Sequence, residues 1–490
     1  MTTYYISSYN GDDANDGLSP ATPWQTLTHL TSYMDNLSST NTESSIHHIR
    51  LERGSNFLGQ SFHIYHGGTP ADPLTIDSYG DENLPLPHID AQGSGIWHED
   101  YHAPIGGSIN HPHRWEGSVS TTLLLFDASY VEVRNLDISN TRSDTSLGFN
   151  DIAAIDRTGI AIIAQDKGTV NHVVLEGLHI HDVEGNVYDK HMANGGIYAI
   201  AHFPTHSSEI EQKIARFNNI HIRRNIVQRT RRWGIAVGYT AYLNFIDQGK
   251  RDESGQWLNR FNYGDGTISD DTITRYGSTN VVIEDNLVED CGGDAITTMY
   301  CYQPIIRHNI SRRAARDISD DIYTATDYDK VAAAIWPWRC KNALFEYNEA
   351  YDTMNADNGN GDGQAWDADF GDGTIYRYNF SSGNSGGTVM FCNEKAVNSQ
   401  FYCNTAYLDH MGAIDIPRNP DAHIHHNVFI LAKDCEPLRS ERADGTALIE
   451  SNIFLNNTRA PFDYCWHPQG SHVIWRSNRY IGFTNNPEED

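Results

Sequence analysis

The chain has 490 residues, of which 39% are hydrophobic and 20% are charged. This composition is typical of a folded protein with a sizeable core and excludes a disordered chain. The sequence contains no apolar run long enough to span a bilayer, so we expect no membrane-spanning helix. The 64 acidic residues outnumber the 35 basic residues and give a net charge of -29, which disfavours binding to nucleic acid.

The first residues of the chain show neither the basic nor the apolar segment of a secretory signal. We therefore expect a cytoplasmic protein if Met1 is the native start, and a secreted or periplasmic protein if a signal has been removed. The acidic surface also disfavours strongly anionic polymers as substrates, unless a bound cation intervenes.

An amphipathic helix is predicted close to the N-terminus. Four apolar residues recur at the spacing of one helix face: Leu27, Leu30, Met34 and Leu37. Thr22 is the expected N-cap and Pro23 the expected first helical residue, because these residue types are favoured at those positions.

Three segments interrupt the strand-like pattern of the chain and are predicted as long loop insertions, at residues 91–118, 184–216 and 239–276. The first two are rich in histidine, and a short helix is expected near Glu209–Phe217. Because loops on a rigid scaffold carry function, we expect the insertions to fold over one side of the molecule. Their histidines are interpreted as sugar-binding or ordinary loop residues, since their spacing is not typical of a metal site.

A short repeat organises the rest of the chain. Alternating apolar residues lead to an asparagine in each copy: Asn135, Asn225, Asn286, Asn309, Asn348, Asn379, Asn404, Asn427 and Asn452. In the most regular part, residues 280–482, four intervals between neighbouring copies are 23 to 25 residues, and longer ones, such as the 39 residues from Asn309 to Asn348, are interpreted as one coil with a loop insertion. This period and the alternation of Ile, Val, Phe and Tyr favour a parallel β-solenoid over a leucine-rich repeat. The asparagines are expected to be structural, because Asn tolerates tight turns and can hydrogen-bond from coil to coil.

The opening of the chain carries three further motifs: Tyr4-Tyr5-Ile6-Ser7, Asn10-Gly11-Asp12-Asp13 and Pro23-Trp24-Gln25-Thr26-Leu27. They resemble the N-terminal cap of right-handed parallel β-helix proteins of the pectin-lyase-like, carbohydrate-active superfamily. The resemblance implies an all-β fold, a single domain over residues 1–490 with about ten or more coils, long loop insertions and a capping helix within residues 1–45. Most members of the superfamily act on polysaccharides, as lyases, glycoside hydrolases or epimerases, and some are adhesins.

A second strand is predicted about ten residues after each asparagine. Its Ile, Val and Phe positions are assigned to the interior, so the alternate positions point outward. The outward positions form one face across neighbouring coils: Ala236, Thr297, Met299, Trp336, Trp338, Asp367, Asp369, Met390, Cys392 and Asp415. Asp362, in the glycine-rich segment ahead of one of these strands, is interpreted as a turn residue.

The tryptophans and carboxylates of this face predict a glycoside hydrolase. The segments 336–338 and 363–369 are similar to those of β-helix glycoside hydrolases that act on plant or algal glycans, which implies an oligosaccharide or polysaccharide of that kind. Three carboxylates are the expected catalytic residues: Asp367 as nucleophile or water-activating base, Asp369 as general acid, and Asp415 tuning or replacing one of them. Five residues are expected to bind the sugar, the first two by exposed stacking and the others by hydrogen bonds: Trp336, Trp338, Arg418, His410 and Glu394.

Two other functions remain open from the sequence. A polysaccharide lyase would use Arg418 as the base, while Asp367, Asp369 and Asp415 would hold a Ca²⁺ ion against the uronate carboxyl. A non-catalytic adhesin that binds glycans is the third hypothesis. The acidic composition and the tryptophan pair favour the hydrolase, for which no metal or other cofactor is expected. In each case the expected partner is a carbohydrate, with no nucleic acid and no membrane involved.

Overall fold

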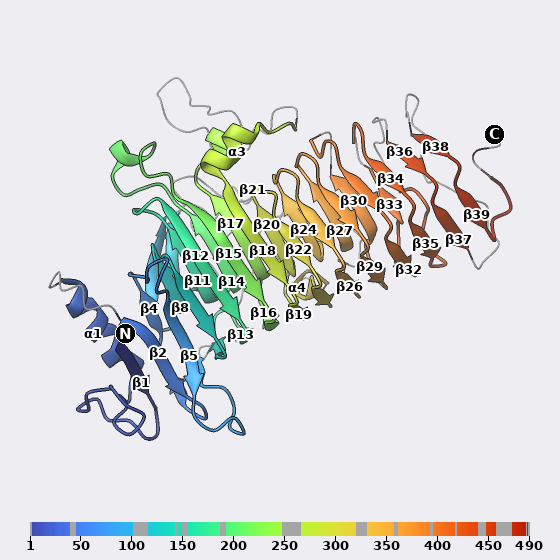
Figure 1. Ribbon diagram of the computed structural model, residues 1–490. Helices are drawn as coiled ribbons and strands as arrows, with labels where there is room; N and C mark the ends of the chain where they lie inside the picture. The colour runs from blue at the N-terminus through green and yellow to red at the C-terminus, as the bar shows by residue number, and fades with distance from the viewer. Residues whose placement is uncertain are drawn as a thin grey trace.

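The computed structural model is a right-handed parallel β-helix whose coils follow one another along a single axis (Figure 1). It describes residues 2–39, 46–100, 116–142, 146–148, 155–186, 193–246, 266–319, 331–356, 361–392, 395–416, 419–439, 447–456, 473–486 and 488. Within these residues three long sheets contain 15, 13 and 11 strands, which pair in parallel except where β7 joins β8. The predicted all-β solenoid is therefore confirmed.

Each complete coil adds one strand to each sheet, in the order first, second and third. The first sheet contains β1 (Thr2–Ile6), β2 (Ile46–Glu52), β5 (Leu74–Tyr79), β9 (Val131–Arg134), β12 (Thr169–Glu176), β15 (Arg216–Arg223), β18 (Ser278–Glu284), β21 (Cys301–Tyr302), β22 (Ile305–Arg307), β25 (Leu344–Glu346), β28 (Ile375–Arg377), β31 (Gln400–Tyr402), β34 (His423–His425), β36 (Leu448–Glu450) and β38 (Ile474–Arg476). The second sheet contains β3 (Asn56–Leu58), β6 (His88–Asp90), β10 (Asp137–Asn140), β13 (His179–Val183), β16 (Ile226–Thr230), β19 (Leu287–Glu289), β23 (Ile310–Arg312), β26 (Glu349–Tyr351), β29 (Phe380–Ser382), β32 (Thr405–Tyr407), β35 (Val428–Leu431), β37 (Ile453–Asn456) and β39 (Arg479–Ile481).

The third sheet contains β4 (Phe62–Ile64), β7 (Ile96–Asp100), β8 (Glu116–Phe126), β11 (Asp156–Ala164), β14 (Gly195–Ala201), β17 (Trp233–Thr240), β20 (Ile296–Met299), β24 (Ile335–Trp338), β27 (Gln364–Asp369), β30 (Gly387–Cys392) and β33 (Ile414–Asp415). The helices are α1 (Leu27–Ser39), the 3-10 helix η2 (Ser207–Glu209), α2 (Leu243–Ile246), α3 (Asp270–Tyr276) and α4 (Arg316–Ser319). Among the described residues no helix is long and apolar enough to cross a membrane.

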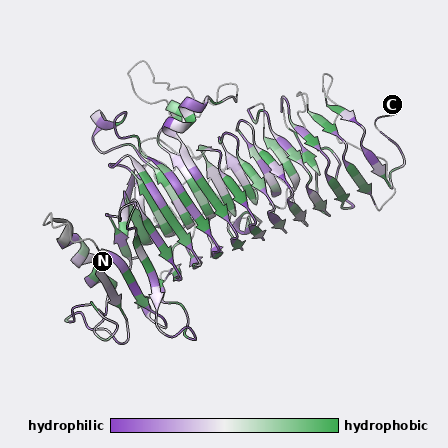
Figure 2. Ribbon diagram, viewed as in Figure 1, coloured by the Kyte–Doolittle hydropathy of each residue, from purple (hydrophilic) through white to green (hydrophobic). Residues whose placement is uncertain are grey.

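The interior of the solenoid is filled by the inward-facing apolar residues of all three sheets. Aromatic rings stack from coil to coil, with ring centroids 4.7 Å apart for Phe345 and Tyr376 and 5.1 Å apart for Phe429 and Phe454. Figure 2 shows hydrophobic residues following the strands of neighbouring coils. Each fully buried side chain of this kind stabilises the fold by about 1.5–3 kcal/mol, so every coil depends on its neighbours for stability.

From β9 onward, a turn of two residues joins each first-sheet strand to the second-sheet strand that follows it. From β15 onward, the second residue of this turn is the asparagine of the repeat. Asn286 Nδ2 donates to Asn309 Oδ1 over 2.9 Å, and Asn309 Nδ2 donates to Asn348 Oδ1 over 3.0 Å. The same contact continues to Asn478, so the predicted coil-to-coil hydrogen bonding of the asparagines is confirmed.

The left-handed residue of these turns is the one before the asparagine, which corrects the sequence-based interpretation. Asp285 and His308 have φ angles of 57° and 54°, whereas a positive φ at a repeat asparagine itself occurs in the described coils at Asn135. A non-glycine residue rarely adopts this conformation, so it needs support from its surroundings. The buried asparagine side chain supplies that support through its hydrogen bonds, and this explains the choice of Asn better than backbone tolerance does.

The predicted N-terminal helix is present as α1, but it begins later than expected. The Thr26 hydroxyl oxygen accepts a hydrogen bond from the backbone N–H of His29 over 3.0 Å, so Thr26 is the N-cap in place of Thr22. Leu27 and Leu30 are fully buried in the main core at the end of the solenoid. The helix therefore covers the N-terminal end of the coils, as the resemblance implied.

Two of the predicted insertions contain regular strands of the third sheet. Segment 91–118 holds β7 and the start of β8, which pair antiparallel. Segment 184–216 holds all of β14, so it is part of a coil and not a single loop. The helix expected near Glu209–Phe217 is wrong: η2 ends at Glu209 and β15 begins at Arg216. Residues 101–115 and 187–192 of these segments lie outside the described residues.

The third predicted insertion, 239–276, holds α2 and α3, and its residues 247–265 lie outside the described residues. Figure 1 shows α3 beside β21, and α3 contacts β18 and β21 of the first sheet, at the edge where the chain passes from the third sheet to the first. Its N-terminal end is attached to that edge, because Lys341 Nζ lies 2.9 Å from Asp270 Oδ1 and the backbone N–H of Ile268 donates to Asp372 Oδ2 over 3.2 Å. The insertion therefore packs on the outside of the solenoid next to the predicted site.

Candidate active site

The structure confirms the register that brings the predicted site residues onto one face. Thr297 pairs with Trp336, Asp367 with Met390, and Met390 with Asp415 along the third sheet. In the next outward position Trp338 pairs with Asp369, and Asp369 with Cys392. The alternate residues, such as Trp366, are buried in the solenoid interior. The strands thus present the tryptophans and the carboxylates on the same outer face of the third sheet.

The two tryptophans are buried on that face, contrary to expectation: Trp336 is 2% exposed and Trp338 is 5% exposed. They belong to an apolar cluster on the outside of the third sheet, which we call the outer cluster. It contains Val119, Leu124, Ala161, Ile163, Ala193, Tyr198, Ile200, Trp233, Ala236, Tyr239, Leu243, Ile246, Ile268, Ile273, Met299, Tyr300, Ala333, Trp336 and Trp338. The expected exposure of these indoles for stacking on sugar rings is therefore wrong, because both are buried in a cluster that also includes residues of α2 and α3.

A buried ion pair holds the indole of Trp336 in place. Asp294 Oδ1 accepts a hydrogen bond from Trp336 Nε1 over 2.8 Å, and Asp294 Oδ2 lies 2.7 Å from Arg232 NH2. The side chains of Arg232 and Asp294 are both fully buried. Removal of either partner would leave a buried charge, so this group fixes the geometry next to the acidic strands.

Two of the three carboxylates of the next coils, Asp369 and Asp415, are more accessible than the tryptophans. Asp367 is 4% exposed, whereas Asp369 and Asp415 are half-buried. Burial raises the pKa of the Cys392 thiol well above its usual value, and the charges of Asp369, Asp367 and Asp362 raise it further. The charges of three carboxylates therefore act on one thiol, and we call Asp362, Asp367 and Asp369 the acidic cluster.

Asp362 is the residue of this cluster that the sequence-based interpretation treated as a turn residue. Its φ of 62° lies in the left-handed region, and it bridges Ala332 of the neighbouring coil. Asn355 holds the backbone around it, because Asn355 Nδ2 donates to the Asp362 carbonyl over 2.9 Å and Asn355 Oδ1 accepts from Gly361 N over 2.7 Å. A Cβ atom on Gly386 would lie 1.6 Å from the Asp362 carbonyl oxygen, so the close approach of the next coil requires glycine there. The Gly-Asp-Gly sequence in front of a site strand was the available signal.

The other predicted site residues are spread more widely. Asp415 lies two strands from Asp367 in the same column, about 9.6 Å away along the sheet. His410 lies in the turn between β32 and β33, and its Nδ1 is 2.9 Å from Asp434 Oδ1. Arg418 and Glu394 lie outside the described residues.

A possible metal geometry occurs elsewhere. Among the described residues, one group of three ligating side chains meets the spacing for a metal ion, and it is His88, Asp137 and His181 on the second sheet. The carboxylates Asp367, Asp369 and Asp415, which the lyase hypothesis assigned to Ca²⁺, do not form such a group in that part of the chain. The outer face of the third sheet therefore carries carboxylates next to the buried aromatic residues of the outer cluster.

Comparisons with known proteins identify the family. A curated lacto-N-biosidase from Bifidobacterium longum subsp. longum is 42% identical over 520 residues, which cover 100% of this chain and 31% of that protein. The chain thus spans about a third of the length of this curated relative. Crystal structures of the GH136 lacto-N-biosidase from Eubacterium ramulus, native and selenomethionine derivative, are 39% identical with a TM-score of 0.80, covering 93% of this chain and 68% of theirs.

No protein-family model matches the chain. The identity to the Eubacterium ramulus enzyme is nevertheless well above the level at which only a fold is shared, and it extends over most of both chains. The chain therefore belongs to the GH136 lacto-N-biosidase family of glycoside hydrolases.

Proposed function

We propose that this chain is a lacto-N-biosidase, which releases the disaccharide lacto-N-biose from the end of a milk oligosaccharide. The observation that carries the proposal is the 39% identity to a GH136 lacto-N-biosidase over 93% of the chain. This substrate takes the place of the plant or algal glycan that the sequence suggested. The same identity favours hydrolysis over the lyase and adhesin hypotheses.

The acidic cluster supports this chemistry, because glycoside hydrolysis uses two carboxyl groups on either side of the scissile bond. Asp369 is the general acid in this proposal, as its place at the end of β27 and its partial exposure allow. A catalytic carboxyl has to reach the sugar, and Asp362 is half-buried while Asp367 is 4% exposed. We therefore assign the nucleophile or base to Asp362 in place of Asp367.

Asp367 then acts on its neighbours and not on the sugar. Residues at i and i+2 on one strand have Cα atoms about 6.6–7 Å apart, so the charge of Asp367 lies close to Asp369. Neighbouring carboxyl groups do not ionise independently, and a proton-donating acid needs such an environment. Asp415, two strands further on, is placed to contact a more distant part of the oligosaccharide.

The experiment that tests the proposal is an assay with a panel of glycans and analysis of the products. We expect the chain to release intact lacto-N-biose from an oligosaccharide that ends in it, and to leave saturated reducing ends. Unsaturated uronate ends that absorb in the ultraviolet would support the lyase. Binding of glycans without any cleavage would support the adhesin, and release of single sugars alone would contradict the proposed specificity.

A further inference from the structure

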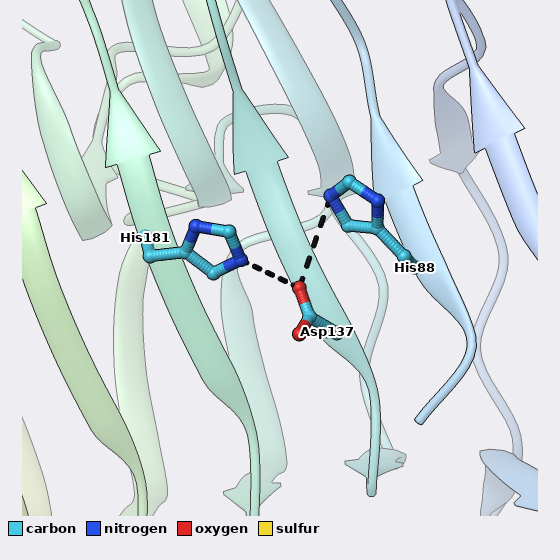
Figure 3. A group of neighbouring side chains, drawn as sticks. All are labelled: His88, Asp137 and His181. Carbon is cyan, nitrogen blue, oxygen red and sulfur yellow. Dashed lines mark hydrogen bonds and ion pairs between the residues drawn. The ribbon is translucent and has the colours of Figure 1, made fainter. Parts of the chain in front are cut away.

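The second sheet carries a group of residues that the proposed activity does not use. We propose that His88, Asp137 and His181 form a binding site for one divalent transition-metal ion, with Zn²⁺ as the preferred ion (Figure 3). The three residues come from the adjacent strands β6, β10 and β13. They lie on a different sheet from the acidic cluster, and the expected role of the ion is to link three early coils.

The spacing of the ligand atoms fits such an ion. His181 Nε2 lies 2.7 Å from Asp137 Oδ1, and His88 Nε2 lies 3.8 Å from the same oxygen. Bonds of about 2.0–2.1 Å in a tetrahedral zinc site place the ligand atoms about 3.3 Å apart, which lies between these two distances. Figure 3 shows both imidazole rings directed toward the one carboxylate oxygen. The third separation, between the two Nε2 atoms, is within 4.8 Å, so side-chain adjustments without a change of backbone would admit the ion.

The other nitrogen of each histidine is held by an acceptor. His181 Nδ1 lies 2.6 Å from Asp182 Oδ2, and His88 Nδ1 lies 2.9 Å from Asn56 Oδ1. These oxygens accept hydrogen bonds, so each favours a proton on Nδ1. Without an ion His181 Nε2 donates to Asp137 Oδ1 over 2.7 Å, and a metal ion would replace this proton and take the Nε2 lone pair. Asp182 is itself fixed by Arg229, whose Nε and NH2 donate to it over 2.7 and 2.8 Å. Metal-binding histidines typically have this outer layer of support.

The carboxylate is supported in the same way. Asp137 uses its second oxygen, Oδ2, to accept from His179 Nδ1 over 3.0 Å, which leaves Oδ1 facing the two Nε2 atoms. The Ser139 hydroxyl lies 2.8 Å from His88 Nε2 and can rotate away from it. In the pairing of the strands Asp137 lies opposite His88, and Ser139, two residues further on the same strand, lies opposite His181, so the parallel ladder fixes the ligand backbones. The site is therefore largely preorganised.

The ligand types define the class of ion. Two imidazoles and one carboxylate suit Zn²⁺, Co²⁺ or Ni²⁺, whereas Ca²⁺ and Mg²⁺ prefer oxygen ligands alone. The ligand side chains of His88, Asp137 and His181 are 27%, 24% and 17% exposed, so solvent can reach the ion and fill its remaining position. An ion held this way joins strands that the sequence places at residues 88, 137 and 181, and it would resist their separation.

Metal counting tests the proposal directly. The chain is freed of metal with a chelator, dialysed against Zn²⁺ and analysed, together with H88Q and H181Q. The control is H425Q, because His425 lies against another histidine, His423, with ring centroids 4.2 Å apart, much as His181 lies against His179 at 4.4 Å, but it belongs to no metal-spaced group among the described residues. We expect H88Q and H181Q each to bind one Zn²⁺ fewer per chain than the parent, and H425Q to bind the same number as the parent. Equal binding by the parent and both ligand variants would overturn the proposal.

Melting temperatures measured with and without Zn²⁺ distinguish the loss of the metal site from the failure of a variant to fold. Zn²⁺ that binds only the folded chain raises its melting temperature by mass action. We expect such a rise for the parent and for H425Q, and none for H88Q, whose circular dichroism should match that of the parent. Co²⁺ should give a visible absorption band in the parent that is absent in H88Q. No rise in melting temperature for the parent would show that the residues form a hydrogen-bond network only.

Discussion

The outer face of the third sheet divides into two regions with the same backbone and opposite surfaces. From β8 to β24 most of its outward residues are apolar, and they form the outer cluster together with residues of α2 and α3. From β27 to β33 the same columns hold Asp367, Asp369 and Asp415. The register continues unbroken across the border between Trp336 and Asp367. The backbone of the solenoid therefore aligns the outward side chains in columns. The identity of these side chains decides whether a strand adds to the buried outer cluster or to the candidate active site.

The largest expected effect comes from the acidic region. D362N and D369N should each lower kcat/KM by about 1,000-fold or more, equivalent to about 4 kcal/mol of transition-state stabilisation, because each removes a reacting carboxyl group. Their melting temperatures should stay close to that of the parent. Steady-state kinetics with a lacto-N-bioside substrate measure this. The matched control is D434N, since Asp434 is exposed and pairs with His410; activity of D362N within tenfold of that control would remove the assignment.

Substitutions in the outer cluster should lower the stability of the fold and leave catalysis unchanged. Trp338→Ala should lower the free energy of unfolding by about 3–5 kcal/mol, because the indole is buried between Tyr239 and Tyr300, with ring centroids 5.6 Å from each. Denaturant titration checks this. Tyr347→Ala removes an aromatic side chain that is 47% exposed and should cost less than about 1 kcal/mol. A stable Trp338→Ala variant with a raised KM would instead restore the sugar-stacking role.

Substitution of Asp367, at the border between the two regions, should cause an intermediate loss of activity. D367N keeps the shape of the side chain but removes its charge, so we expect kcat to fall by about tenfold to a hundredfold. KM should change little, because the 4% exposed carboxyl does not reach the sugar. A loss as large as that of D369N would return Asp367 to the role of nucleophile or base.

The smallest expected effect is a pH dependence of stability that arises from His425 in the C-terminal coils. Burial, together with the charges of His423 and His426, lowers the pKa of His425 from 6.5 to about 4. Between those pH values the unfolded chain takes up a proton that the folded chain does not, so stability falls as the pH drops from about 6.5 to about 4. H425Q should lose less stability over that range and match the parent's pH dependence above pH 7. Equal acid sensitivity in thermal melts of both chains would contradict this.

The sequence was sufficient for the features that follow from alternation and repetition. The positions of Trp366, Asp367 and Asp415 followed from the period-two pattern, because an inward residue has to be apolar. Features that depend on packing between distant segments were not accessible in the same way. Trp336 is buried in the outer cluster, which brings together residues of the strands from β8 to β24 and of two helices and leaves no periodic signal. His88, Asp137 and His181 belong to separate coils, and no local motif joins them.

The two-residue turn that carries the repeat asparagine, between the first and second sheets, limits where insertions can arise in such chains. From β9 onward the turn between the first and second sheets keeps two residues, even where 39 residues separate Asn309 from Asn348. Each asparagine amide donates a hydrogen bond to the side-chain oxygen of the asparagine in the next coil. Extra residues inserted at this corner would therefore leave buried N–H donors without an acceptor. Added length is therefore confined to the two corners that flank the third sheet. In evolution, new substrate preferences can arise around the acidic strands while the opposite edge of the solenoid stays unchanged.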